Sequence, residues 1–248
     1  MFLAVGVLPA LVVGYFGWRG SGRIQDAVAN QLQSVSIDAM DKIERNLFER
    51  YGDVQAFGYN TVAHEQDNWY VVGDANKVAQ VMDRYVAAYG LYYITLLVDL
   101  DGKVAAVNTK DASGKRLDTD KIYAMNFKDT SWFRDAVGGK FLSSPKLTGT
   151  VVEDVYVDPI IKDVFGDEGL CMGYSAPVTD SSGKMIGVWK NYAMWSLVED
   201  IVAATNDGLH GIGMVGAELT LLDRAGRVIA DCDPATHGKP ISRDMQRM

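Results

Sequence analysis

The residues best suited to chemistry in this sequence are aromatic and polar side chains on short apolar segments between residues 128 and 191. Aromatic rings give a site apolar walls, and a few amides or charged groups beside them fix the orientation of a small solute. We therefore expect a binding site. Its candidate ligand-binding residues are Lys128, Trp132, Phe133, Tyr156, Asp158, Tyr174, Trp189 and Asn191.

Asn191 is the strongest single candidate, because asparagine is unusual in a strand of otherwise apolar residues. It alternates with Trp189, so both side chains are expected on one face. Tyr156 and Asp158 also share a face if their segment is extended. The alternatives are a turn formed at Asp158-Pro159 and an Asn191 that only satisfies a buried backbone group.

Trp132 and Phe133 are adjacent in a segment with helical periodicity, so they cannot share one face of the helix. We expect one ring to line the pocket and the other to pack in the core. Lys128, one turn earlier, is expected to supply a positive charge. Packing in the core for both rings, and a solvated surface charge for Lys128, remain the alternatives.

No catalytic or metal-binding motif accompanies these residues in the sequence. His64, His210 and His237 have no second ligand three or four residues away, and there is no nucleophile elbow, P-loop or dinucleotide fingerprint. Cys171 and Cys232 lie far apart, without metal or redox spacing. We therefore expect neither enzyme activity nor a cofactor.

The apolar pattern alternates between the helical and the strand period, which predicts an α+β fold. Asp74 and Ser196 are suitable N-caps, and Glu199 would complete a capping box with Ser196. The pattern predicts strands over 92–98, 103–108, 169–178 and 185–194, and helices over 75–88, 127–137 and 196–205. The glycine-rich segment 208–213 is expected to be a connector.

The sequence contains an internal repeat of an apolar strand, an Asp-x-x-Gly turn and a second strand. The first turn is Asp99 to Gly102, and the second is Asp223 to Gly226. We interpret the two as the opening hairpins of two related modules. The second module shows only its first hairpin, which is too little to bury a core, so we expect the sequence to be a fragment.

The first 18 residues carry no charged side chain, and Arg19 ends this run. A membrane-spanning helix needs about 17–25 such residues. A cleaved signal peptide and a buried core helix are the alternatives. From Ile24 to Leu47 apolar residues recur every three or four positions, which predicts an amphipathic helix. We expect it to lie against its own domain and, as a stalk, also to pack against a partner helix in a homodimer.

The chain has 248 residues, a formal net charge of −8 and a pI near 4.9. An acidic chain of this kind lacks the basic surface that nucleic acids require, so a nucleic-acid partner is not expected. Anionic lipid would also repel it, so attachment to a membrane must be hydrophobic.

The order of these features resembles the double Cache, PAS-like ligand-binding region of bacterial methyl-accepting chemotaxis receptors. Segments 126–136, 155–159 and 186–201 resemble that family's pocket helix, its extended pocket-side segment, and its last strand with the closing helix. The resemblance implies an antiparallel sheet flanked by helices. It also implies four parts: a transmembrane helix (1–18), a stalk helix (19–55), a membrane-distal Cache module (56–206), and a connector with the truncated start of a membrane-proximal module (207–248).

Family members that bind amino acids place an arginine two residues before the tryptophan and an aspartate on the last strand. Here those positions are matched to Thr130 and Asn191. Threonine cannot offer a carboxylate the bidentate guanidinium fork, and asparagine brings no charge to an ammonium group. The sequence therefore does not predict a plain amino-acid ligand.

By resemblance, the chain would sense a small molecule outside the cytoplasm and transmit a chemotaxis signal across the bacterial inner membrane, with the sensing domain periplasmic or extracellular. A sensor histidine kinase or a diguanylate cyclase with the same sensing region is the first alternative. A membrane-anchored exported enzyme or adhesin is the second.

Overall fold

The computed structural model describes residues 2–145 and 147–241 of the chain, with the backbone alone for residues 2–24. The chain divides into two units, Met1–Glu44 and Arg45–Met248. Where side chains are described, no helix is both long enough and apolar enough to cross a membrane. The predicted membrane span at residues 1–18 lies outside that part of the chain.

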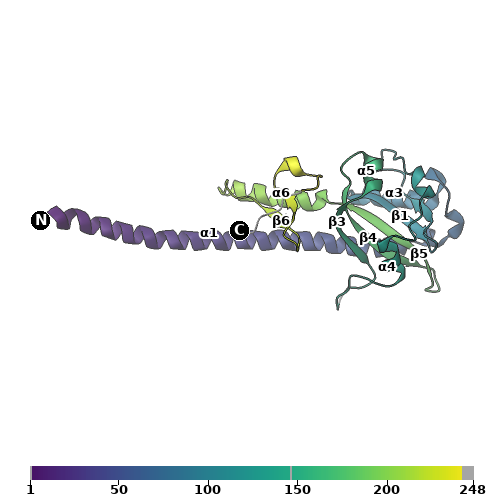
Figure 1. Cartoon of the computed structure of the whole chain (residues 1–248), viewed down its shortest axis with the longest axis horizontal. Helices are drawn as coiled ribbons and strands as arrows, with labels where there is room; N and C mark the ends of the chain where they lie inside the picture. Colours follow the sequence, from purple (N-terminus) through teal and green to yellow (C-terminus); the bar gives the residue numbers. More distant parts are fainter. Residues whose placement is uncertain (1, 146, 242–248) are drawn as a thin grey trace. The chain divides into compact units, whose positions relative to one another are not determined.

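The first element is one long helix, α1 (Phe2–Gly58), which includes the helix predicted from the apolar periodicity of Ile24 to Leu47 (Figure 1). Its last turns belong to the second unit, where Val54 and Phe57 are buried. Tyr51 and Gln55 tie this end to the segment around Thr150: the Tyr51 hydroxyl donates to the Leu142 carbonyl at 2.7 Å, and Gln55 Nε2 donates to Thr150 Oγ1 at 2.9 Å.

The second unit is built on a five-stranded antiparallel sheet of order β2-β1-β5-β4-β3 (Figure 1). Four of the five strands are the predicted ones, with ends that differ by at most one residue. The strands are β1 (Tyr92–Asp99), β2 (Val104–Val107), β3 (Val151–Val157), β4 (Leu170–Thr179) and β5 (Met185–Met194).

The register of the central strands separates two sets of side chains, because residues directly opposite one another in a sheet point to the same face. Lys190 of β5 pairs with Ser175 of β4, and Tyr192 with Gly173. These four residues share what we call the lysine face. Asn191, which pairs with Tyr174, lies on the opposite face, here called the asparagine face.

The asparagine face is closed by aromatic packing with the end of α1 and with α3 (Lys77–Tyr89). The Phe57 ring stacks on Tyr85 with centroids 4.0 Å apart and meets the Trp189 ring edge-on at 6.2 Å. Asn76 caps α3 by accepting from the Val78 and Ala79 amides, and Gly90 ends the helix in the left-handed conformation.

The predicted cap of this helix, Asp74, is therefore wrong. Residues Gly73–Ala75 form a 3₁₀ turn that places Asn76 at the first turn of α3 instead. The Asp74 carboxylate accepts from Thr109 Oγ1 at 2.7 Å and pairs with Arg116. Asn76 thus occupies the N-cap position of α3, for which an aspartate is also suited.

Two short helices, α4 (Ser131–Val137) and α5 (Pro159–Phe165), accompany the lysine face. Helix α4 begins four residues later than predicted. The sequence does not predict α5 at all, because Asp158-Pro159 also suits a turn. Asp158 accepts from the Ile160 and Ile161 amides and Pro159 occupies the first turn, which is a strong helix start.

After β5 the chain continues directly into α6 (Ser196–Gly211), then into a separate two-stranded sheet of β6 (Thr220–Leu222) and β7 (Val228–Asp231). The predicted capping box is wrong: no side chain caps α6, and Glu199 accepts from the Gly238 amide at 2.9 Å. Helix α6 also includes four of the six residues expected to form a connector, since glycine costs a helix only about 1 kcal/mol.

The two repeated turns have the same geometry. Asp99 Oδ1 accepts from the amides two and four residues later at 2.8 and 2.9 Å, and Asp223 Oδ1 does the same at the same distances. However, Asp111 and Asp180 form this turn as well. The turn alone therefore does not mark a module, and the division at residue 206 stays a prediction.

Candidate ligand-binding site

The lysine face buries a charge at the centre of the sheet. Lys190 is only 1% exposed, although lysine is almost never fully buried unless it is paired. Its ammonium group forms an ion pair with Glu153 of β3 and donates to the Tyr156 hydroxyl at 3.4 Å. Strands β3 and β5 are not neighbours, so the pair bridges the backbone of β4 between them.

Three aromatic rings surround this ammonium group and form what we call the aromatic cage. Lys190 Nζ lies 4.5 Å from the ring centroids of both Trp132 and Tyr192, and 5.9 Å from that of Tyr156. The negative face of such a ring attracts a cation by about 0.5–2 kcal/mol. Helix α4 supplies Trp132, while β3 and β5 supply the two tyrosines.

Burial sets the protonation behaviour of the site. It lowers the pKa of Lys190, because a low-dielectric surrounding disfavours the charged form, and the negative charge of Glu153 opposes this effect. Burial raises the pKa of both Tyr156 and Tyr192, so their hydroxyls stay protonated and can donate hydrogen bonds. It also raises the pKa of Cys171 to about 12, which makes this thiol a poor nucleophile.

A glycine and a serine on β4 complete the floor of the site. Gly173 faces the Glu153 carboxyl group: a Cβ atom at this glycine would lie 2.9 Å from Glu153 Cδ. Ser175, directly opposite Lys190, is fully buried, and its hydroxyl has no hydrogen-bond partner among the described residues. An unpartnered buried hydroxyl on the same face as a buried cation is costly for a structural core but useful for holding a polar ligand.

Three of the predicted residues lie on this side of the sheet. Trp132 and Tyr156 belong to the aromatic cage. Phe133 is 3% exposed and packs in the hydrophobic core, with its ring edge-on to Trp132 at 5.9 Å. Trp132 is 4% exposed and belongs to the same hydrophobic core, so both rings are buried and they differ in that Trp132 also contacts Lys190. Whether the Trp132 ring also lines a ligand pocket stays a prediction.

Three other predicted residues, Tyr174, Trp189 and Asn191, lie on the asparagine face, with the sheet between them and the cage. Asn191 Oδ1 accepts from Thr95 Oγ1 at 2.6 Å and from the Trp189 indole at 2.9 Å, while its amide nitrogen has no partner among the described residues. All three side chains are buried, and the Trp189 ring contacts those of Phe57 and Tyr85. The structure does not bring them together with Trp132.

The remaining two predicted residues have local partners. Lys128 is exposed and pairs with Asp101 at the β1–β2 turn, at 3.2 Å. Thr130 stands at the start of α4 and donates only to the Phe127 carbonyl, so this turn brings no positive charge to the cage. Asp158 is the N-cap of α5.

Sequence reasoning missed the central residue of the site, Lys190, together with Glu153, Gly173, Ser175 and Tyr192. A signal for Lys190 was present: it is the one charged residue in the ten-residue strand Met185–Met194. The same argument that singled out Asn191 applies with more force to a lysine, whose burial costs more.

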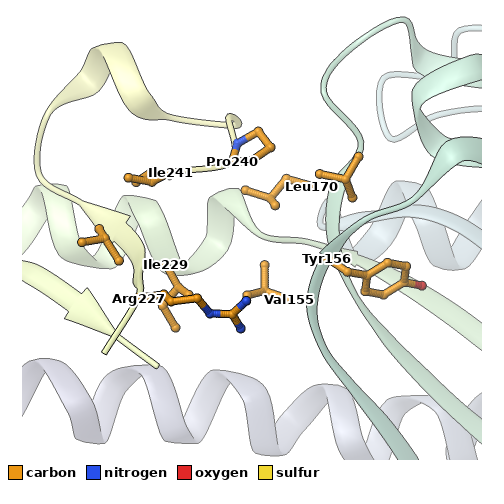
Figure 2. A pocket seen from close by; sticks show the side chains of 9 residues that line it. Val155, Tyr156, Leu170, Arg227, Ile229, Pro240 and Ile241 are labelled. Atoms are coloured by element: carbon orange, nitrogen blue, oxygen red, sulfur yellow. The ribbon is translucent and has the colours of Figure 1, made fainter. Parts of the chain in front are cut away.

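A hollow of about 170 Å³ lies between the edge of the sheet and the second hairpin, apart from the aromatic cage (Figure 2). Val155 of β3 lines it together with Arg227, Ile229, Pro240 and Ile241. Figure 2 shows the ring of the neighbouring Tyr156 directed away from Arg227 and Ile229. In the described part of the chain, no group of three His, Cys, Asp or Glu residues could hold a metal ion.

The fold is similar to that of several solved chemoreceptor domains. The sensory domain of the Campylobacter jejuni chemoreceptor Tlp3 matches with a TM-score of 0.60 and 16% identity, over 87% of this chain and 75% of that one. The same domain with isoleucine bound matches with a TM-score of 0.59 and 16% identity, over 90% and 78%. The ligand-binding domain of the Pseudomonas aeruginosa chemoreceptor PctC, in complex with GABA, matches with a TM-score of 0.54 and 17% identity, over 85% and 78%.

No protein-family model matches the chain, and no curated protein matches it in sequence. At these identities the similarity establishes the fold. The predicted resemblance to chemoreceptor sensing regions is therefore confirmed at the level of the fold, which is α+β with an antiparallel sheet flanked by helices.

Proposed function

We propose that this chain is the extracytoplasmic sensing region of a transmembrane chemoreceptor, and that a small molecule binds at the aromatic cage around Lys190. The observation that carries the proposal is a charged, aromatic-lined site on a sheet whose fold is shared with chemoreceptor ligand-binding domains. The solved neighbours bind small solutes, among them isoleucine and GABA. A buried ion pair with an unpartnered serine beside it suits ligand binding better than it suits packing.

The N-terminal part of the proposal concerns residues 1–55. Residues 1–18 would span the inner membrane, and residues 19–55 would form the stalk. Val28 and Leu32, one turn apart on α1, are 39% and 36% exposed, as expected of a helix face that meets a second copy of the chain. Such a homodimer would carry a ligand-induced shift toward the membrane.

A solute screen on the full chain in detergent tests the proposal. The thermal unfolding midpoint is measured with amino acids, amines, organic acids and purines, and at least one class is expected to raise it. Trp132→Phe keeps an aromatic ring but changes the cage, so it should reduce the shift. Trp69→Phe, which alters a buried tryptophan that donates to the Ala63 carbonyl, is the matched control and should keep it.

Two results would contradict the proposal. One is the absence of any shift across the four classes of solute. The other is turnover of a solute by the purified chain, which would favour an exported enzyme. Whether the output is a chemotaxis bundle, a histidine kinase or a diguanylate cyclase is decided by the cytoplasmic sequence, since all three use the same kind of sensing region.

A further inference from the structure

The buried ammonium group of Lys190 restricts what can enter the aromatic cage. A second cation would have to lie beside it in a low-dielectric site, where like charges repel strongly. An anion would instead gain a charge-assisted hydrogen bond that is about twice as strong as a neutral one. The charge at the site therefore favours a negatively charged group on the ligand.

The carboxylate of Glu153 occupies the position beside Lys190 that a negatively charged group of the ligand would take. Its side chain is 24% exposed, against 1% for Lys190, so the carboxylate can turn toward solvent while the lysine cannot. The lysine is thus the fixed partner of the pair and the glutamate the replaceable one.

Gly173 provides the space that the carboxylate occupies. Its backbone does not adopt a left-handed conformation, so β4 would accept a larger residue there without backbone strain. While Glu153 holds its present position only a glycine leaves room, because a Cβ atom would lie 2.9 Å from Glu153 Cδ and 3.2 Å from Glu153 Cβ. The requirement for a glycine at position 173 therefore comes from the Glu153 side chain and not from the backbone conformation of β4.

Ser175 offers the lysine face a hydrogen-bond donor that Glu153 does not use. Its hydroxyl lies on the lysine face directly opposite Lys190, is fully buried and has no partner among the described residues. A carboxylate has two oxygens and about four acceptor positions. One that is not tethered to β3 can accept from the lysine with one oxygen and from the serine with the other.

We propose that the ligand binds through a carboxylate that displaces Glu153 from Lys190 and accepts from Ser175. This inference rests on the proposed function and names the chemical class of its ligand. Any ligand ammonium group would have to lie away from the lysine, where the released Glu153 can meet it.

Calorimetric titration of the full chain in detergent tests this, with propionate and succinate as the probes and propylamine and propanol as the matched cationic and neutral ones. Both carboxylates should bind, and the amine and the alcohol should not. Lys190→Met should abolish binding. Ser175→Ala should weaken it about tenfold, the effect of one hydrogen bond to a charged group.

Glu153→Gln should change the affinity for carboxylates in the opposite direction, so this test does not rely on a variant that loses binding. The amide keeps the size of the side chain and removes the competing charge, so both carboxylates should bind about tenfold more tightly. Gly173→Ala fills the space itself and should abolish binding while the circular dichroism spectrum stays unchanged.

The outcomes separate this inference from the proposed function. If neither carboxylate binds, or if Lys190→Met and Glu153→Gln leave their affinity unchanged, the carboxylate inference is wrong. If propylamine binds instead and Trp132→Phe weakens it, the sensing site stands and the ligand class is wrong. If no solute of any class is bound, the proposed function fails as well.

Discussion

The two faces of the central sheet differ in how they treat polar groups. On the asparagine face the polar groups are uncharged: Trp189, Thr95 and Asn191 share hydrogen bonds, although the Asn191 amide nitrogen has no partner among the described residues. The Phe57 and Tyr85 rings pack over this face. On the lysine face, a full charge is buried with a partly exposed partner, a glycine and an unpartnered serine.

This difference indicates that the two faces of the sheet contribute differently to the stability of the unit. Aromatic packing on the asparagine face contributes the stability of the unit. The lysine face gives up stability to keep a charged site, because well-packed apolar residues in place of a buried ion pair are often neutral or stabilising. Substitutions matched across the two faces test this comparison.

The largest effect is expected on the asparagine face. Phe57→Ala removes a ring that contacts Tyr85, Tyr92 and Trp189, and should lower the free energy of unfolding by about 3–5 kcal/mol. Phe48→Ala, on the same helix but 58% exposed, should change it by less than about 0.5 kcal/mol. Urea denaturation measures both, and equal effects would contradict the assignment of this face.

A smaller loss of stability is expected on the lysine face, and a second substitution should reverse it. Lys190→Met leaves Glu153 without its partner and should cost about 1–3 kcal/mol, limited by the glutamate's access to water. Combining it with Glu153→Met should restore or exceed the original stability. If the double variant is less stable than the single one, the ion pair is a structural element and the comparison fails.

The smallest difference concerns how the helices on each face begin. Asn76 caps α3 with two accepted amide bonds, so Asn76→Ala should cost about 1–2 kcal/mol. Thr130 makes no capping bond to α4, and Thr130→Ala should cost only about 0.5 kcal/mol. Thermal unfolding distinguishes the two, and a larger loss at Thr130 would mean that α4 is held as firmly as α3.

Much of the fold follows from local patterns in the sequence. Four strands and the long first helix were predicted because their apolar residues recur with a period of two residues in strands and of about 3.6 residues in helices. Helix α5 was missed because Asp158-Pro159 begins a turn and a helix equally well. The caps of α3 and α6 were misassigned because several nearby residues can accept the same amide bonds.

The site was predicted only in part, for a different reason. Alternation correctly groups Trp189 with Asn191 and, on the other face, Lys190 with Tyr192. It does not say which group faces α4, because that depends on how the helices pack onto the finished sheet. Local patterns could not predict the Lys190–Glu153 pair. The two residues lie 37 positions apart in the chain, on strands that are not adjacent in the sheet.

The tethered carboxylate of Glu153 also has a consequence for sensitivity. A group attached to the same chain competes with free ligand at an effective concentration that is commonly millimolar. A receptor with such a built-in competitor responds only when the solute outside is abundant, and its threshold can be moved by a single side chain without altering the surfaces that recognise the ligand. In the proposed sensor, the side chain above Gly173 would set the working range, and Lys190 would set the class of ligand that is detected.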